Sequence, residues 1–275
     1  MGKLPESSFP VTKRTIMYKT LEIEQVGKIA TIWMNRPAVL NAFDEQLIAE
    51  LATACTELDA DASVRVLVLG GRGKHFSAGA DLNWMQRAAQ FTHEQNLEDA
   101  RKFANMLRTL SEMSKPTIAR VQGAALGGGT GLTAACDMAI ASSDAVFSTS
   151  EVKFGIIPSA ISPYVLRAIG PRHALRYFQS AERISAERAL AIGLVGDVVP
   201  LAELDASLDK LLDALLQGGP QAQKAAKELI VAVNGKTIDK NLSEETAQRI
   251  ARQRATDEAK EGIAAFLEKR SPGWI

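Results

Sequence analysis

The sequence predicts an α/β fold with a helical C-terminal part. Two continuous apolar runs, residues 64–70 and 116–121, are typical of strands in a parallel sheet that is covered on both faces. Strand-like and helix-like segments alternate up to Ile161, and the pattern after it is almost wholly helical. This order is typical of an α/β core with an appended helical unit. We therefore divide the 275 residues into an N-terminal tail, a core and a helical subdomain, over residues 1–17, 18–200 and 201–275.

The first elements follow from local patterns. Residues 20–25 and 29–34 flank a turn at Gly27, which predicts a hairpin of two strands. Asp44 is placed to cap a helix over residues 45–59, where apolar side chains recur at helical spacing. The apolar strand that ends at residue 70 then leads into a long loop.

Capping signals place the next helices. A helix over residues 82–90 is followed by another over 93–113, which Thr92 and Gln95 begin with a capping box. Beyond the second apolar strand we expect short strands at 137–142 and 145–149, and helices near 161–168, 171–178, 185–192, 201–217, 219–234, 243–256 and 257–268.

The composition excludes several classes of protein. Hydrophobic residues make up 46% and charged residues 23% of the chain, and the formal net charge is +0. A neutral chain lacks the basic surface that binds nucleic acid or anionic lipid, so we expect no nucleic-acid partner and no membrane partner. The weakly polar stretch 117–141 contains Arg120, Gln122 and Asp137, which favours a buried strand and helix over a bilayer span.

Cysteine and histidine usage argues against a metal site. Cys55 and Cys136 lie in apolar surroundings without metal-ligand spacing, as is typical of reduced core residues in a cytosolic protein. The three histidines are scattered along the chain. The N-terminal residues contain no apolar segment of the kind that a secretory signal needs. We therefore expect a cytoplasmic protein that holds no metal ion.

Two segments share one design, in which a buried strand leads through small residues and glycine to the start of a helix. They are VLVLGGRGKHFSAGADL at 66–82 and TIARVQGAALGGGTGL at 117–132. Glycine lets a ligand approach the backbone closely, and a helix N-terminus directs free N–H groups at that ligand. One N–H from each segment can converge on a single oxygen, as in an oxyanion hole for a thioester carbonyl that becomes an enolate.

These glycines have two other interpretations. Tight packing of strand against helix stays open from the glycine loop alone. A dinucleotide-binding loop is not supported, because GAALGGG at 123–129 lacks the required spacing and no suitable charged residue follows the next strand.

At these residues the sequence resembles a known family. FSAGADLNWM at 76–85 and VQGAALGGGTGLTAACDMAIAS at 121–142 are similar to the two signature segments of the enoyl-CoA hydratase/isomerase, or crotonase, superfamily. The resemblance covers roughly residues 18–270. Further segments agree in order and spacing: NRPAVLNAF, SEVKFGIIP at 150–158, ERISAERALAIGLVGDVVP at 182–200 and EGIAAFLEKR at 261–270.

The resemblance implies a fold, a ligand and a set of site residues. The fold is a spiral of β-β-α units, and residues 201–275 become the oligomerisation subdomain of a homotrimer or a dimer of trimers. An acyl-CoA binds between subunits, and coenzyme A enters only as part of the substrate, with no further cofactor. The oxyanion donors are the N–H groups of Ala80 and Gly128. The substrate- and CoA-binding set is Ala78, Asp81, Leu82, Gly127, Gly131, Ser162, Phe266 and Lys269, of which the last two come from the C-terminal helix and reach a neighbouring site.

One position departs from the family pattern. Typical hydratases of this family carry a glutamate three residues past the donor glycine and a second one twenty residues further on. Glu151 stands at the second position, whereas Gly131 stands at the first. Two carboxylates normally divide the work of hydration, one on the water and one on the proton at C2. We expect Gly131 to leave a gap that holds water or a bulkier acyl group, and Asp81 and Asp137 to serve as caps or hydrogen-bond anchors.

The segment after residue 150 most resembles the methylglutaconyl-CoA hydratase-like branch. It predicts hydration of a branched or glutaconyl-type 2-enoyl-CoA, with Glu151 as the acid and base at C2. Water would be activated by a substrate carboxylate, by a polar residue near Ser162 or by Glu151 itself. Lys153 and Arg167 are either cationic partners of an acyl carboxylate or plain surface residues. The alternatives are an enoyl-CoA isomerase, which needs one carboxylate, and a low-turnover acyl-CoA-binding relative.

Overall fold

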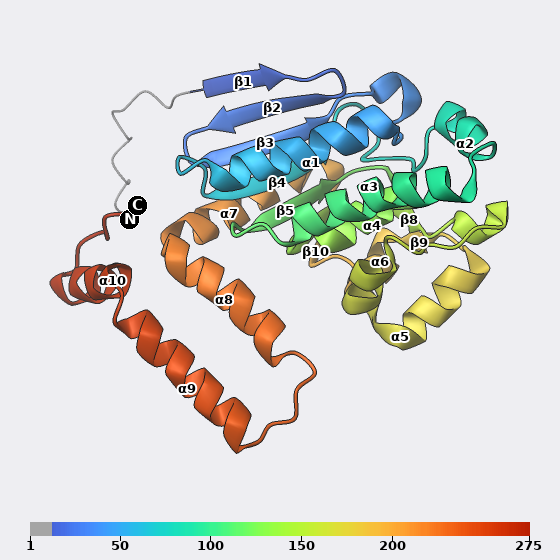
Figure 1. The fold of residues 1–275 in the computed structure, drawn as a ribbon. Coiled ribbons are helices and arrows are strands. Elements are labelled where there is room, and N and C mark those ends of the chain that lie inside the picture. The colour runs from blue at the N-terminus through green and yellow to red at the C-terminus, as the bar shows by residue number, and fades with distance from the viewer. Residues whose placement is uncertain (1–12) are drawn as a thin grey trace.

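A seven-stranded sheet forms the centre of the computed structural model, which describes residues 13–275. Its order is β1-β2-β3-β4-β5-β7-β10. The first three strands pair antiparallel and the others pair parallel. Figure 1 shows this sheet behind the helices that cover it. The strands are β1 (Lys13–Met17), β2 (Leu21–Val26), β3 (Ile29–Met34), β4 (Val66–Gly71), β5 (Thr117–Val121), β7 (Met138–Ser142) and β10 (Asp197–Val199).

A second, three-stranded sheet carries part of the site. It consists of β6 (Ala124–Leu126), β8 (Val146–Ser148) and β9 (Ile184–Ser185). The loop after β4 extends this sheet through an isolated parallel bridge between Ser77 and Ala125. The two glycine-containing segments are therefore joined directly by backbone pairing.

Both faces of the large sheet are covered, as the continuous apolar strands require. Leu67 and Leu69 of β4 face the main core, where α1 (Glu45–Ala60), α3 (His93–Ser111) and α4 (Gly128–Ala135) pack. Val66 and Val68 face the other way, against α7 (Leu204–Gln217), which buries Leu204, Leu208 and Leu212 there. Figure 1 shows α1 and α3 side by side over the sheet.

Further elements connect these layers. They are α2 (Leu82–Ala88), α5 (Ser162–Ser180), α6 (Ala186–Ala191) and the 3-10 turns η1 (Pro37–Val39), η2 (Glu151–Phe154) and η3 (Leu201–Glu203). Helix α5 is two helices joined at Gly170, whose φ of +71° interrupts the helical path. This break agrees with the two separate helices that the sequence predicts at 161–168 and 171–178.

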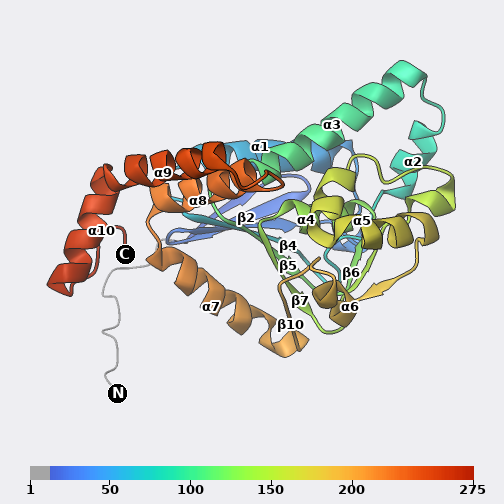
Figure 2. The same ribbon diagram turned by 90° about the horizontal axis from the view of Figure 1, so that it is seen from below.

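Three C-terminal helices extend away from the sheet. Figures 1 and 2 show α8 (Pro220–Val233) and α9 (Lys240–Arg254) as an antiparallel pair, with α10 (Asp257–Glu268) at the end remote from α2 and α5. Lys227 of α8 holds Asp137 at 2.9 Å, which attaches this unit to the core. Their exposed apolar side chains include Ile230, Val231, Ile238, Ile250, Ile263, Phe266 and Leu267.

Most of the predicted elements are confirmed, with boundaries that differ by no more than three residues. The capping box of Thr92 and Gln95 is present, and Asp44 caps α1 as predicted. The expectation that residues 13–17 belong to a tail is wrong, because they form β1 and pair with β2, while residues 1–12 lie outside the described residues. Strands β6, β9 and β10 were missed. Within residues 13–275 no helix is long and apolar enough to cross a bilayer.

Candidate active site

Ala80 lies in a short parallel bridge between the loop after β4 and the segment before α1. Phe43 pairs with Ala80: its N–H donates to the Gly79 carbonyl at 2.7 Å, and its carbonyl accepts from the Asp81 N–H at 2.8 Å. Along an extended chain successive backbone groups point to opposite sides. The bridge therefore uses the groups that flank Ala80, and the Ala80 N–H itself makes no hydrogen bond within residues 13–275.

Gly128 supplies the second free N–H. It is the first residue of α4, so no acceptor lies behind it in the helix. Gly127 turns the chain into the helix at φ +51°, where an L side chain is strained, and its own N–H donates to the Ser148 carbonyl at 2.7 Å. Within the described part of the chain the Gly128 N–H has no acceptor. Both sequence-predicted donors are thus available to a ligand.

The two donors line one cavity of about 570 Å³. Its walls come from the bridge segment, α2, one face of α3, the η2 turn and the loop over residues 156–161, and they are mainly apolar. A Cβ on Gly128 would lie 2.9 Å from Cε2 of Phe43 and 3.0 Å from Cζ of Phe103. The two rings pack edge to face with each other, and together they leave no room for a side chain on Gly128.

Glu151 opens the η2 turn and faces the same cavity. Its Oε1 lies within 3.4 Å of the point where a Cβ on Gly127 would stand, which sets the carboxylate beside the donor turn. Its Oε2 is buried and has no hydrogen-bond partner among residues 13–275. Burial raises the pKa of Glu151 above its ordinary value. A buried carboxyl group with a free oxygen in a cavity is typical of a group that exchanges a proton with a ligand.

The expected gap at Gly131 is not present. A Cβ on Gly131 would lie 2.1 Å from Cγ2 and 2.7 Å from Cβ of Ile161. Ile161 fills that space and itself lines the cavity, whereas Gly131 does not. The expectation of room for water or acyl bulk at Gly131 is therefore wrong, because an apolar side chain takes the position where typical hydratases hold their other carboxylate.

The remaining predicted site residues fall into two groups. Ala78, Leu82 and Gly127 line the cavity beside Ala80 and Gly128. Asp81 lies outside it and caps α2, as its expected role of cap or anchor requires. The Ser162 hydroxyl donates to the Ser159 carbonyl at 2.7 Å and also lies outside the lining.

The C-terminal pair lies far from the cavity of its own chain. Phe266 is 82% exposed, and Lys269 ends α10 at φ +57°. Figures 1 and 2 place α10 opposite α2 and α5, so both residues are remote from the site within one chain. Arg167 stacks near the Tyr164 ring in another groove, whereas Lys153 does line the cavity.

Sequence reasoning missed several residues that line the cavity. Asp99 lies one helical turn before Phe103 and shares its face of α3, so the helical period could have indicated it. Burial raises the pKa of Asp99, although the Trp84 indole N–H donates to its Oδ1 at 3.3 Å and opposes the shift. Arg183 lines the cavity too, but no spacing in the sequence distinguishes it from a surface arginine.

Comparison with known proteins agrees with this geometry. The family model described as enoyl-CoA hydratase/isomerase matches residues 24–275. The chain belongs to the enoyl-CoA hydratase/isomerase family. A solved structure of an enoyl-CoA hydratase from Shewanella pealeana is 43% identical with a TM-score of 0.90, over 93% of this chain and 96% of that one. The predicted crotonase fold is therefore confirmed.

Curated relatives point to the same family of enzymes. Crotonyl-CoA hydratase of Syntrophomonas wolfei is 35% identical over 264 residues, covering 94% of this chain and 98% of the relative. The 2,3-dehydroadipyl-CoA hydratase of Escherichia coli is 33% identical over 256 residues, covering 92% and 97%. The chain is thus an enzyme of the enoyl-CoA hydratase/isomerase family.

Proposed function

We propose that this enzyme adds water reversibly across the α,β double bond of a 2-enoyl-CoA. Relatives of similar length that are named hydratases support this direction of chemistry. The observation that carries the proposal is the buried, unpartnered Oε2 of Glu151 in the cavity that the free N–H groups of Ala80 and Gly128 also line.

The reaction follows from these three groups. The thioester oxygen accepts hydrogen bonds from Ala80 and Gly128. The oxygen of water bonds to C3, the electrons of the double bond move toward the thioester oxygen as an enolate, and Glu151 takes the proton that the water loses. Glu151 then returns this proton to C2, and the enolate collapses to the thioester. A raised pKa suits this exchange, because burial makes the Glu151 carboxylate a stronger base for the proton of water.

Glu151 is assigned both proton steps because the other candidates are less well placed. Ser162 points to the Ser159 carbonyl outside the cavity. The position of the missing carboxylate is filled by Ile161. The other candidate for activating water is a carboxylate on the substrate itself.

The substrate that we propose is a branched or glutaconyl-type 2-enoyl-CoA. Lys153 and Arg183 line the cavity, and within residues 13–275 neither side chain makes an ion pair or hydrogen bond. Two cations without partners suit a carboxylate on the acyl chain. The name of the dehydroadipyl-CoA hydratase relative likewise specifies an acyl group with a second carboxyl.

A Glu151→Gln variant tests the catalytic assignment. Turnover of 2-enoyl-CoA, measured as loss of the enoyl-thioester absorption band, is expected to fall by about 10²-fold or more, the usual scale for a general acid and base. Binding of the saturated acyl-CoA should be retained, since glutamine keeps the shape of the side chain. Near-normal turnover in this variant would show that Glu151 is not the catalytic group.

A second candidate is an enoyl-CoA isomerase, and the contact between Gly131 and Ile161 favours it. Ile161 puts an apolar side chain where a second carboxylate would orient water, whereas moving a proton between C4 and C2 needs a single carboxylate. Assays with matched 2-enoyl-CoA and 3-enoyl-CoA separate the two. Hydration consumes the conjugated band of the first substrate, and isomerisation creates that band from the second.

We propose further that the chain works as a homotrimer or a dimer of trimers in the cytoplasm. The exposed apolar side chains of α8, α9 and α10 support self-association, with Phe266 and Lys269 reaching the site of another subunit. The buried free thiols of Cys55 and Cys136 suit a reducing compartment.

A further inference from the structure

We propose that Arg36 is a positioning residue that aims the Ala80 N–H at the thioester oxygen. This inference rests on the proposed function, which gives that N–H the role of an oxyanion donor. Arg36 does not line the cavity. It acts through the two carboxylates that follow the bridge between Phe43 and Ala80.

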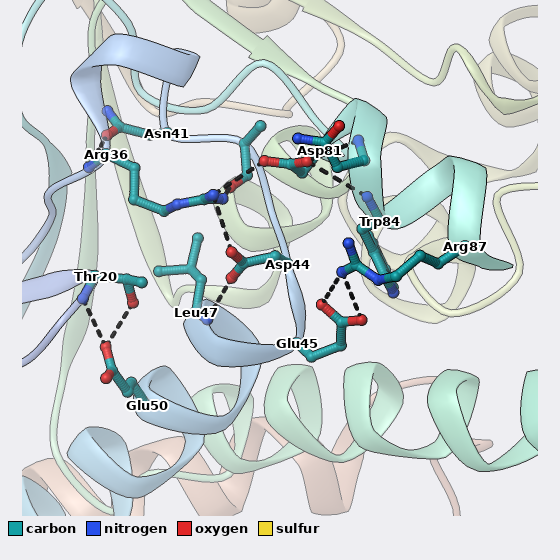
Figure 3. A network of polar contacts seen from close by, with 12 residues as sticks. Thr20, Arg36, Asn41, Asp44, Glu45, Leu47, Glu50, Asp81, Trp84 and Arg87 are labelled. Carbon is teal, nitrogen blue, oxygen red and sulfur yellow. Dashed lines mark hydrogen bonds and ion pairs between the residues drawn. The ribbon is translucent and has the colours of Figure 1, made fainter.

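The two carboxylates occupy equivalent positions. Phe43 and Ala80 are the bridged residues, and Asp44 and Asp81 each follow one of them. The Nη2 atom of Arg36 lies 2.9 Å from Oδ2 of Asp44 and 3.0 Å from Oδ2 of Asp81. Figure 3 shows the guanidinium between the two side chains. The Arg36 guanidinium therefore holds the two bridged segments together through side chains that do not line the cavity.

Each carboxylate also begins a helix with its other oxygen. Oδ1 of Asp44 accepts from the Leu47 N–H at 2.8 Å, which caps α1. Oδ1 of Asp81 accepts from the Asn83 N–H at 2.9 Å and from the Trp84 N–H at 3.4 Å, which caps α2. Arg36 thus links the N-terminus of α1 and that of α2, which borders the cavity, to the backbone that carries Ala80.

Arg36 is itself held at its other donors. Its Nη1 donates to the Ala42 carbonyl, and its backbone N–H donates to Oδ1 of Asn41 at 2.9 Å. Asn41 lies at φ +55° and donates from Nδ2 to the carbonyls of Arg72 and His75, at 2.9 and 2.8 Å. The guanidinium is therefore fixed in place, and a lysine ammonium cannot reproduce its fork of donors.

The contacts of Arg36 with Asp44 and Asp81 join charged side chains that are mostly buried. The side chains of Arg36, Asp44 and Asp81 are 18%, 20% and 8% exposed. Burial by itself would raise the pKa of Asp81, but the hydrogen bonds from Arg36 and from the helix N–H groups outweigh it and hold the pKa below its usual value. Without Arg36, the Asp44 and Asp81 carboxylates, which both contact its Nη2, would repel each other directly beside Ala80. The bridge would then loosen where the N–H direction is set.

The test compares Arg36→Gln with a matched control, Arg87→Gln. Arg87 of α2 pairs with Glu45 of α1 at 2.6 Å, so it joins the same two helices, but at the exposed surface and outside the cavity. Figure 3 shows the ion pair of Arg87 with Glu45 together with the contacts of Arg36. Turnover, KM and thermal unfolding are measured for each variant. The red shift in absorption of bound cinnamoyl-CoA reports how strongly the oxyanion donors polarise the thioester.

We expect Arg36→Gln to lower kcat by about 10²-fold, the scale for losing one oxyanion donor, with KM changed less than about threefold. The red shift should shrink in the same variant while the fold persists. Arg87→Gln should keep kcat and the shift, since an exposed ion pair contributes little. Arg36→Lys, which reaches one carboxylate, should recover part of both quantities, and it serves as the test if the glutamine variant does not fold.

The outcomes separate this inference from the proposed function. Glu151→Gln should lose turnover and keep the red shift, because it leaves the donors untouched. An unchanged kcat and red shift in both Arg36 variants overturn the positioning role and leave the hydratase proposal standing. If the wild-type enzyme shifts the absorption of cinnamoyl-CoA but turns over no 2-enoyl-CoA, the proposed reaction is wrong. The role of Arg36 is then still measured by the red shift of its variants. The absence of any shift in the wild type overturns both.

Discussion

The Ile161 side chain fills the space into which any side chain at position 131 would point. A Cβ on Gly131 would overlap its Cγ2 at 2.1 Å. The residues at positions 131 and 161 therefore depend on each other. Position 131 has no side chain because Ile161 occupies the space that a side chain there would need. The space beside Gly131 is filled by the Ile161 side chain rather than left open.

This contact predicts how a second carboxylate can be installed. Gly131→Glu alone should destabilise the fold by about 1–3 kcal/mol through overpacking and should not increase hydration. Ile161→Ala does not suffice as a partner, because its Cβ would still lie 2.7 Å from the new Cβ. Gly131→Glu with Ile161→Gly should fold better than Gly131→Glu and hydrate crotonyl-CoA faster than Ile161→Gly. Denaturant unfolding and initial rates check this, and a Gly131→Glu variant of unchanged stability contradicts it.

The raised pKa of Glu151 predicts a pH-dependent stability. The folded state binds the Glu151 proton more tightly than the unfolded state, so the linked stabilisation is full below the ordinary glutamate pKa of about 4.3 and is lost as pH rises through the raised value. Glu151→Gln should therefore raise the Tm at pH 7–8, and this gain should vanish toward pH 4.

Glu50 provides the opposite control for that experiment. Burial would raise the pKa of Glu50, but hydrogen bonds from Thr20, Gln46 and Lys19 outweigh it and lower the pKa. Its stabilisation is present above the ordinary pKa and is lost as pH falls through the lowered value. Glu50→Gln should therefore lower the Tm at neutral pH. If both variants shift the Tm in the same direction at pH 7, the assignment of a costly buried charge at Glu151 is incorrect.

The charges around the cavity predict substrate preference. Lys153→Gln and Arg183→Gln should raise KM for a carboxylated 2-enoyl-CoA about threefold to fivefold, the scale of an exposed ion pair, with little effect on crotonyl-CoA. Asp99→Asn should act in the opposite direction, because it removes a like charge from the cavity. Steady-state assays with the two substrates at low and high salt measure these effects. Equal changes for both substrates would reject a carboxylate-binding role.

The exposed C-terminal helix predicts assembly. Phe266→Asp should shift the mass measured by light scattering toward the monomer, because it places a charge on an apolar face of α10. The neighbouring Glu268→Gln should leave the mass unchanged, since Glu268 only pairs with Arg270 at the surface. A wild-type mass near 29.6 kDa at micromolar concentration would rule out the trimer.

Elements with local signals could be predicted, and elements that depend on distant pairing could not. The helix over residues 257–268 has the predicted bounds, because Thr256 caps it and an apolar face repeats along it. Strands β6, β9 and β10 are two or three residues long and exist through pairing with partners far along the chain. No propensity within so short a segment identifies a strand.

The candidate site shows the same division. The strand–glycine–helix order indicated one backbone donor in each segment, and the family resemblance placed these donors at Ala80 and Gly128. The contact between Gly131 and Ile161 joins residues that no spacing rule connects, so the missing carboxylate suggested an empty space. No local signal distinguishes Arg36 within NRPAVLNAF, because its two carboxylates come together only through the bridge between Phe43 and Ala80.

The contact of Gly129 with Ser77 has a consequence for how such an enzyme can diversify. A Cβ on Gly129 would meet the Ser77 carbonyl at 2.5 Å, so the two donor-bearing loops touch backbone to backbone. A side chain at position 129 would therefore disturb both donor-bearing loops together. The cavity walls, in contrast, are built from replaceable side chains such as Phe103 and Ile161. Selection is therefore free to exchange substrates while the machinery that polarises the thioester stays constant.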